Sequence, residues 1–341
     1  MDMFQTDAKR GMVLGGFIGD AHAMPVHWYY DLAALRRDHG RVTDYLAPRN
    51  PHPDSILWRS RYTAPCPRGE ILHDQARYWG QRGVHYHQHL AAGENTLNLQ
   101  LAVLLLESLH QRGGYQADDY LDRYIRFMTE PGHHRDTYIE ECHRNFFSNL
   151  ARGRTPRRCG EPDIHIGGLA HVGILCAAFG EDPSRTREIV REHIGLTHPD
   201  PSLLHAADAL TAMLCAVLQG TTLRDAIAEH GRDHFSAKRS EKLAGEPDEN
   251  VIGRVFSPAC YIRDAFPATL HLAWKYADRF EAGILANTNV GGDNCHRGAV
   301  LGSLLGGASG EQSLHRPLVD GLKNRECLHR LLSPASAAKA G

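Results

Sequence analysis

The sequence predicts an all-α protein, and three observations favour this fold class. Apolar residues recur at the helical period of about 3.6 in several long segments. Period-two alternation with β-branched residues, which is typical of half-buried strands, is scarce. Glycines recur every fourth residue near both ends of the chain, so each set lies on one face of a helix.

The elements between these glycine segments are expected to be helices separated by loops. Residues 40–72 are broken by prolines, which remove backbone donors and end helices, so a loop is expected there. Residues 236–250 are polar and mixed in charge, and they are expected to form a connection. Apolar periodicity predicts the helices at residues 97–109, 168–179, 184–193, 203–218 and 268–287.

The glycine stripes predict which helices pack together. A glycine inside a helix costs about 1 kcal/mol relative to alanine, so a stripe indicates that another backbone lies close. Three unrelated glycines are the simpler alternative in each segment. Antiparallel packing of the stripes would bring Asp20 and Asp293 to one mouth of the fold. The stripes consist of Gly11, Gly15 and Gly19 near the N-terminus and of Gly298, Gly302 and Gly306 near the C-terminus.

Composition limits the class of protein. The chain has 341 residues and a formal net charge of −2, so no general attraction to nucleic acid is expected. Its eight cysteines include no CxxC pair, which favours reduced thiols and a cytoplasmic location. The apolar runs are shorter than the ~20 residues of a membrane helix, so no membrane partner is expected. We expect one domain over residues 1–334 and a frayed tail over 335–341.

Several short segments carry side chains suited to a site. Glu94 precedes a helix start at Asn95 or Thr96, where simple capping is the alternative explanation. A Gly-Gly pair opens the segment 167–179 and offers backbone amides to an anion. His198 precedes another helix and faces either that helix or a pocket. Just before Glu94, the segment with His85, His87 and His89 is either a polar loop near the site or a metal-binding group of histidines.

The ordered set of these segments resembles the ADP-ribosylglycohydrolase family, which includes dinitrogenase reductase-activating glycohydrolase and the crystallin J1 group. The resemblance covers about Gly11 to Gly310. It rests on GDAHAMPVH at 19–27, GENT at 93–96, HIGGLAH at 165–171, LTHP at 196–199 and GGDNCH at 291–296. The resemblance implies a compact orthogonal bundle of many helices.

The resemblance also implies two Mg²⁺ ions, but the matching positions depart from the family's ligands. Asp293 alone is kept as an aspartate. Mg²⁺ prefers hard oxygen ligands, so we expect either no metal or one softer divalent ion on Asp293, Cys295 and His296. The departures are His27 for glutamate, Gly93 for threonine, Glu94 and Asn95 for an aspartate pair, and Cys295 and His296 for an aspartate and a threonine.

The predicted function is hydrolysis of a ribosyl C1 N- or O-glycosidic bond in a small-molecule or protein-linked ADP-ribosyl compound, without the two-Mg²⁺ centre. The alternative is an inactive ADP-ribose-binding or crystallin-like structural protein. Glu94 and Asp293 are the predicted catalytic carboxylates. The predicted substrate-binding residues are Asp20, His27, Asn95, Gly167, Gly168, His198, Gly291, Gly292 and His296.

Overall fold

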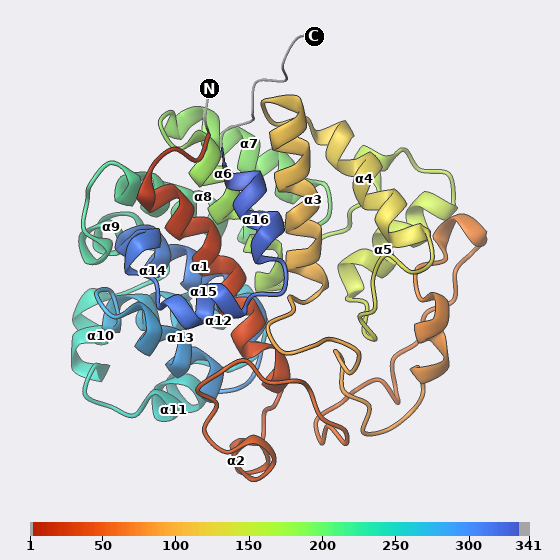
Figure 1. Ribbon diagram of the computed structural model, residues 1–341, viewed down its shortest axis with the longest axis horizontal. Coiled ribbons are helices and arrows are strands. Elements are labelled where there is room, and N and C mark those ends of the chain that lie inside the picture. The colour runs from red at the N-terminus through yellow and green to blue at the C-terminus, as the bar shows by residue number, and fades with distance from the viewer. Residues whose placement is uncertain (1–2, 334–341) are drawn as a thin grey trace.

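The computed structural model describes residues 3–333, so the predicted tail at 335–341 lies outside the described residues. Over residues 3–333 the fold is all-α, as predicted, with two isolated bridges and no strand. Figure 1 shows the helices as one bundle. The helices are α1 (Asp7–Ala23), α2 (Leu32–His39), α3 (Leu97–Arg112), α4 (Ala117–Thr129), α5 (Glu141–Ala151), α6 (Val172–Phe179), α7 (Pro183–Gly195), α8 (Pro201–Leu218), α9 (Leu223–His230), α10 (Ala237–Leu243), α11 (Asp248–Asn250), α12 (Ile262–Lys275), α13 (Phe280–Asn289), α14 (Asn294–Ser309), α15 (Arg316–Gly321) and α16 (Arg325–Leu332).

The centre of the bundle is the pair formed by α1 and α14, which come from opposite ends of the chain (Figure 1). Their glycine faces meet in antiparallel order, as the stripes predict. A Cβ atom added to Gly15 would lie 2.1 Å from the carbonyl oxygen of Gly302, and one added to Gly19 would lie 2.0 Å from that of Gly298. Only glycine allows backbones to approach this closely, so the stripes hold the two helices in register.

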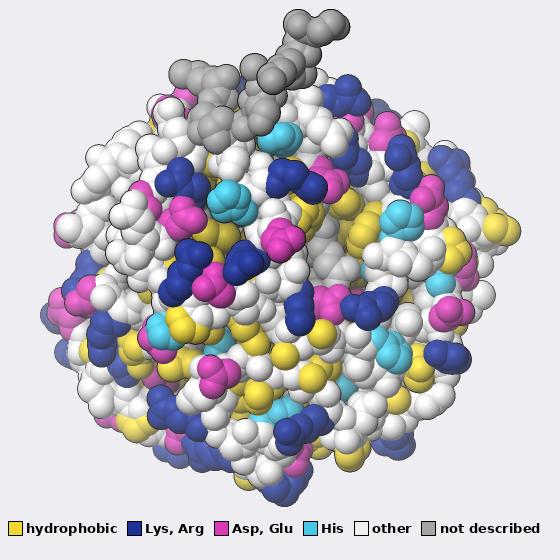
Figure 2. All heavy atoms as spheres, in the orientation of Figure 1, with side chains coloured by type: hydrophobic (Ala, Val, Ile, Leu, Met, Phe, Trp, Pro, Cys, Tyr) yellow, Lys and Arg dark blue, Asp and Glu magenta, His cyan; other side chains and the backbone are white. Residues whose placement is uncertain are grey.

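The other core helices surround this pair. Helices α6, α12 and α13 pack against it, and α8 packs behind them against α6, α7 and α9. α8 alone among the described helices has the length and hydropathy of a membrane span, but half of that window is buried within the fold. Basic and acidic side chains are interspersed over the face shown in Figure 2.

Two predicted elements differ from the structure. The predicted helix over 268–287 is two helices, α12 and α13, separated at residues 276–279. Tyr276 ends the first helix, and its hydroxyl donates to Asp248 at 2.6 Å, a tertiary contact that periodicity does not reveal. The predicted connection over 236–250 contains α10, which begins where Ser236 accepts a hydrogen bond from the Arg239 amide. The segment is polar and lacks a clear apolar period, so the sequence pattern did not predict this helix.

The loop predicted over 40–72 has only one short 3₁₀ turn, Pro67–Gly69. Buried side chains nevertheless anchor this loop to the rest of the fold. The Nε2 atom of His52 lies 2.9 Å from the carbonyl oxygen of His27, and the Tyr86 hydroxyl donates to the carbonyl oxygen of Asp54 at 3.0 Å. The loop is therefore held against the segments that carry His27 and Tyr86.

Candidate functional site

The turn before α14 determines where Asp293 lies. Gly292 donates to the carbonyl oxygen of Tyr29 at 2.7 Å and accepts from the Trp28 amide at 2.8 Å. A Cβ atom at Gly292 would lie 2.2 Å from the carbonyl oxygen of Pro258, so a larger residue does not fit. The glycine turn thereby joins three segments and directs the Asp293 side chain into the protein, where it is fully buried.

On one side, Asp293 is linked to a pair of histidines and a second aspartate. His27 Nε2 lies 2.8 Å from Asp293 Oδ1, and His27 Nδ1 lies 2.7 Å from His87 Nε2. His87 Nδ1 then lies 2.5 Å from Asp136 Oδ1. Burial lowers the pKa of His27 to about 3, so this ring is neutral at pH 7.

On the other side, His296 joins Asp293 to Glu140. His296 Nδ1 lies 2.8 Å from Asp293 Oδ1, and its Nε2 lies 3.1 Å from Glu140 Oε1. Burial disfavours charge on all three groups, but their mutual attraction outweighs it. Asp293 and Glu140 therefore raise the pKa of His296 well above its usual value, and His296 lowers the pKa of Glu140 to about 2.

The six residues Asp136, His87, His27, Asp293, His296 and Glu140 form what we call the histidine–carboxylate chain. At neutral pH it has a carboxylate, imidazolium, carboxylate order at the Glu140 end. The pKa of Asp293 is held far below its usual range: burial opposes the charge, but His296 and His27 stabilise it more strongly. Charged side chains of this kind are rarely buried unless they are paired.

Glu140 connects the histidine–carboxylate chain to a cavity of about 380 Å³, which we call the Glu140 cavity. Its wall includes three aromatic rings that pack edge to face, with centroids 4.6 Å apart for Trp28 and Tyr86 and 5.3 Å apart for Trp28 and Tyr138. Two exposed aromatics lie at its rim, Tyr30 at 44% and Tyr261 at 50% exposure. Exposed aromatic groups beside a cavity indicate a binding surface.

Trp28 itself is held in an unusual backbone conformation. Its φ angle is +61°, which is rare for a bulky residue and costs on the order of 1–3 kcal/mol. The hydrogen bond from its amide to Gly292 maintains this conformation, and its ring stacks on His27 at 3.8 Å. The strain therefore places an aromatic surface beside the histidine–carboxylate chain.

Asp20, a predicted substrate-binding residue, lies at the same end of the α1–α14 pair, but its carboxylate binds the segment before α3. Its Oδ1 accepts from the Thr96 hydroxyl at 2.7 Å, and its Oδ2 accepts from the Thr96 amide at 2.9 Å and from Asn95 at 2.8 Å. Asp136 likewise accepts from the Leu97 amide at 2.7 Å. Two distant carboxylates thus satisfy the first amides of α3, which Thr96 does not cap with its own side chain.

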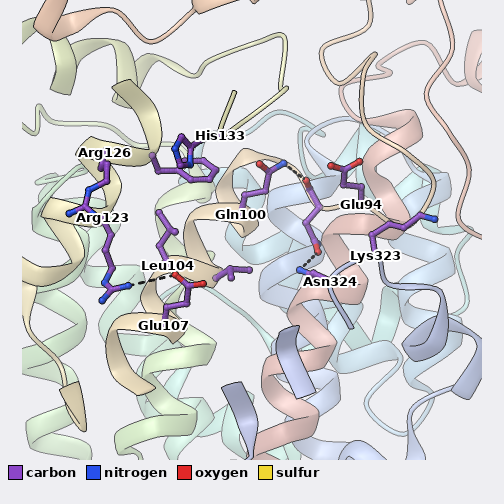
Figure 3. Close-up of a pocket in the computed structure, with 12 residues that line it drawn as sticks. Glu94, Gln100, Leu104, Glu107, Arg123, Arg126, His133, Lys323 and Asn324 are labelled. Atoms are coloured by element: carbon purple, nitrogen blue, oxygen red, sulfur yellow. Dashed lines mark hydrogen bonds and ion pairs between the residues drawn. The ribbon is translucent and has the colours of Figure 1, made fainter. Parts of the chain in front are cut away.

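Glu94 lines a different depression from Glu140. Its carboxylate pairs with Arg135 at 2.7 Å and accepts from the Ala91 amide at 2.8 Å. Figure 3 shows Glu94 near Lys323 and Asn324, in a groove of about 580 Å³ lined by α3, α4 and the start of α16. The described contacts therefore do not bring the two predicted catalytic carboxylates, Glu94 and Asp293, into one site.

The remaining residues predicted to bind substrate lie around the histidine–carboxylate chain. A Cβ atom at Gly167 would lie 3.5 Å from the His296 ring, and one at Gly168 would lie 2.9 Å from His198 Cγ. The glycines are needed for close packing against these histidines. Gly291 accepts a hydrogen bond from buried Arg297 at 2.7 Å, which stabilises the turn before Asp293.

Sequence reasoning missed Asp136 and Glu140, and it named His87 only as part of a metal-binding alternative. The structure does not gather His85, His87 and His89 into one site, and residues 86–89 form a turn. His85 instead contacts the carbonyl oxygen of Pro25, at 3.1 Å, and the His89 ring packs on Tyr78. The only available signal was the density of histidines, which does not show which ring faces which partner.

Two sets of side chains around His27 have donor atoms close enough to share one ion. One set is His27, Asp293 and His296, and the other is His27, His87 and Cys295. In each set the donor atoms lie within 4.8 Å of one another. Cys295 thus lies on the His87 side of His27, whereas sequence reasoning grouped it with Asp293 and His296.

Comparison with known proteins places this architecture in a class. The ADP-ribosylglycohydrolase family model matches residues 2–340, so the chain belongs to the ADP-ribosylglycohydrolase family. A solved structure described as an ADP-ribosylglycohydrolase-related protein complex has the same fold, with a TM-score of 0.64 and 22% identity over 96% of this chain and 95% of that one. No curated protein matches the sequence significantly. The predicted family and fold are thereby confirmed.

Proposed function

We propose that the chain hydrolyses a ribosyl C1 N- or O-glycosidic bond in the Glu140 cavity, with Glu140 as the catalytic carboxylate. The observation that carries this proposal is that Glu140, of the six residues of the histidine–carboxylate chain, is the one that lines the cavity. Its side chain is 17% exposed and reaches the cavity, whereas Asp293 is fully buried behind His296. Glu140 thus takes the role that sequence reasoning gave to Glu94, and Asp293 becomes a positioning residue.

The chemistry follows from the charge of Glu140. An ionised carboxylate either accepts a proton from the attacking water or stabilises the oxocarbenium-like transition state of glycoside hydrolysis. His296 holds the carboxylate in the ionised form and in place. Asp293 in turn holds the charge on His296, and His27 and His87 connect Asp293 to Asp136.

The ADP-ribosyl group is the proposed substrate class, because the family acts on it. The cavity also offers positive charge for a pyrophosphate group. Burial opposes a charge on His165, but the Asp163 carboxylate and the Cys260 thiol outweigh it and raise the pKa of His165 to about 11. His165 and Arg59 both line the Glu140 cavity. A small-molecule and a protein-linked substrate both fit this proposal.

The residues present do not suit the family's two Mg²⁺ ions, so the proposal includes no step through them. Two Mg²⁺ ions require several oxygen ligands in octahedral geometry. Both oxygens of Asp20 are used by Thr96 and Asn95, and Glu94 pairs with Arg135 elsewhere. Asp293 Oδ2 is a buried oxygen without a hydrogen-bond partner among residues 3–333. One softer ion on His27, Asp293 and His296 remains the alternative occupant.

The second candidate function is a protein that binds ADP-ribose without cleaving it. The observation that favours it is the loss of the family's ligand aspartates other than Asp293. Under this alternative the histidine–carboxylate chain would only stabilise the fold.

Replacing Glu140 with glutamine tests the proposed function. Glu140→Gln keeps the shape of the side chain but removes its charge, so the rate of release of ADP-ribose from an ADP-ribosyl substrate is expected to fall by about 10²–10⁴-fold. Glu188→Gln, on the exposed face of α7, is the control and should retain the full rate. A large loss in Glu94→Gln with no loss in Glu140→Gln would return the catalytic role to Glu94.

Calorimetric titration of ADP-ribose tests the metal-free interpretation. We expect the same affinity in Mg²⁺ and in EDTA, because the described residues provide a donor set unsuited to two Mg²⁺ ions. Binding that requires Mg²⁺ would contradict this expectation. If Glu140→Gln binds ADP-ribose but does not turn over the substrate, the result supports catalysis by Glu140. If the wild-type protein binds ADP-ribose but hydrolyses no substrate, the result supports the second candidate function.

A further inference from the structure

Three metal-ligating side chains lie close together outside the histidine–carboxylate chain. They are Cys142 on α5, Asp163 in the loop after it, and His198 in the turn before α8. One donor atom from each lies within 4.8 Å of the other two. All three are buried, with exposures of 2%, 9% and 4% in that order. We call them the cysteine trio.

Contacts with neighbouring groups orient two of these side chains. Asp163 Oδ1 accepts from the His165 amide at 2.8 Å and lies 2.6 Å from His165 Nδ1, which leaves Oδ2 available. His198 Nδ1 lies 2.8 Å from the Thr197 hydroxyl, which leaves Nε2 available. Ligating histidines and carboxylates are usually held by outer contacts of this kind.

The third side chain, Cys142, is a buried thiol at the start of α5. Cys142 is the second residue of α5, and the amides at a helix N-terminus stabilise negative charge. Cys142 is a free cysteine, so no disulfide bond occupies its sulfur atom. Without an ion the thiol is protonated, because burial raises the pKa of Cys142 well above its usual value. A bound cation would displace that proton.

From this geometry we propose that the cysteine trio binds one Zn²⁺ ion. Thiolate, imidazole and carboxylate are the three ligand types that Zn²⁺ takes in proteins, whereas Mg²⁺ and Ca²⁺ require oxygen ligands. Binding forms a Zn–S bond and releases the thiol proton to solvent. Three protein ligands leave the fourth tetrahedral position to a water molecule.

The ion would stabilise the segments that form the Glu140 cavity. Cys142 follows Glu140 by two residues, and Asp163 precedes His165 by two residues. Both Glu140 and His165 line that cavity. A Zn²⁺ ion on the trio would therefore hold two walls of the cavity together and fix Glu140, without taking part in the reaction. This site differs from both sets of donor atoms around His27.

The test is metal loading of the full chain. The protein is stripped with a chelator, reloaded with Zn²⁺ or Co²⁺, desalted and analysed by elemental mass spectrometry and absorption spectroscopy. We expect about one equivalent of metal and, with Co²⁺, the near-ultraviolet charge-transfer band of a cobalt–thiolate bond. Zn²⁺ should also raise the melting temperature of the wild-type protein, because it binds the folded state.

Matched cysteine variants locate the ion. Cys142→Ser should lose the thiolate band, while Cys159→Ser, at another buried cysteine, and Cys295→Ser, in the set with His27 and His87, should retain it. His198→Gln should weaken Zn²⁺ binding at least tenfold. This variant replaces Cys142→Ser in the test if Cys142→Ser does not fold. Absence of the band in the wild-type protein, its persistence in a folded Cys142→Ser, or its loss in Cys295→Ser instead would each overturn the proposal.

Discussion

Gly302→Ala is expected to destabilise the protein by at least about 3 kcal/mol, a large part of the 5–15 kcal/mol that stabilises a typical domain. The added Cβ atom would lie 1.9 Å from the carbonyl oxygen of Gly15 and 2.6 Å from its carbonyl carbon. Both obstacles are backbone atoms of α1, so no side-chain rotation relieves the clash. The two central helices would have to separate along their whole contact.

Gly195→Ala is the matched control. Gly195 is the last residue of another helix, α7, and a Cβ atom there would meet no atom within 4 Å. Alanine should change the stability by no more than about 1 kcal/mol and in the stabilising direction. Guanidinium unfolding of the two variants measures both effects. Equal unfolding free energies would show that the α1–α14 contact is not as close as the structure indicates.

Acidification is expected to destabilise the fold steeply between about pH 6.5 and pH 4. Burial lowers the pKa of His22, His52 and His171 from 6.5 to about 4 in each case. In that pH range the unfolded chain binds a proton at each of these histidines and the folded chain does not, so the unfolding free energy decreases as pH falls. Each contributes roughly 2–3 kcal/mol once the pH reaches about 4.

Denaturant unfolding at pH 7.5, 6 and 5 measures this dependence. A variant of an exposed histidine, His205→Gln, should leave the slope with pH unchanged, because its ring is 58% exposed. His22→Gln should reduce the slope, even though it also removes the contact between His22 Nδ1 and the Thr288 hydroxyl at 2.7 Å. A stability that stays constant from pH 7.5 to pH 5 would contradict the expected neutral, buried state of these rings.

Sequence-local patterns predicted the parts of this protein that depend on neighbouring residues. Apolar periodicity identified α3, α7 and α8 to within a few residues, because a helix with one buried face needs apolar residues at the helical period. The glycine stripes predicted the antiparallel pairing of α1 and α14, because glycine on every fourth position indicates a close backbone contact. The ordered motifs indicated the family, which the family model confirms.

Tertiary contacts decided the composition of the site. The histidine–carboxylate chain joins residues from four separate segments, and no spacing in the sequence indicates that His87 faces His27 or that Glu140 faces His296. The same holds for Glu94, which follows the family motif but pairs with Arg135 in another groove. Helix periods and turn residues act over a few positions, whereas the burial of paired charges depends on which distant segments the fold brings together. The sequence by itself therefore determined the helices, their central pairing and the family, and only the tertiary structure decided which carboxylate reaches the cavity.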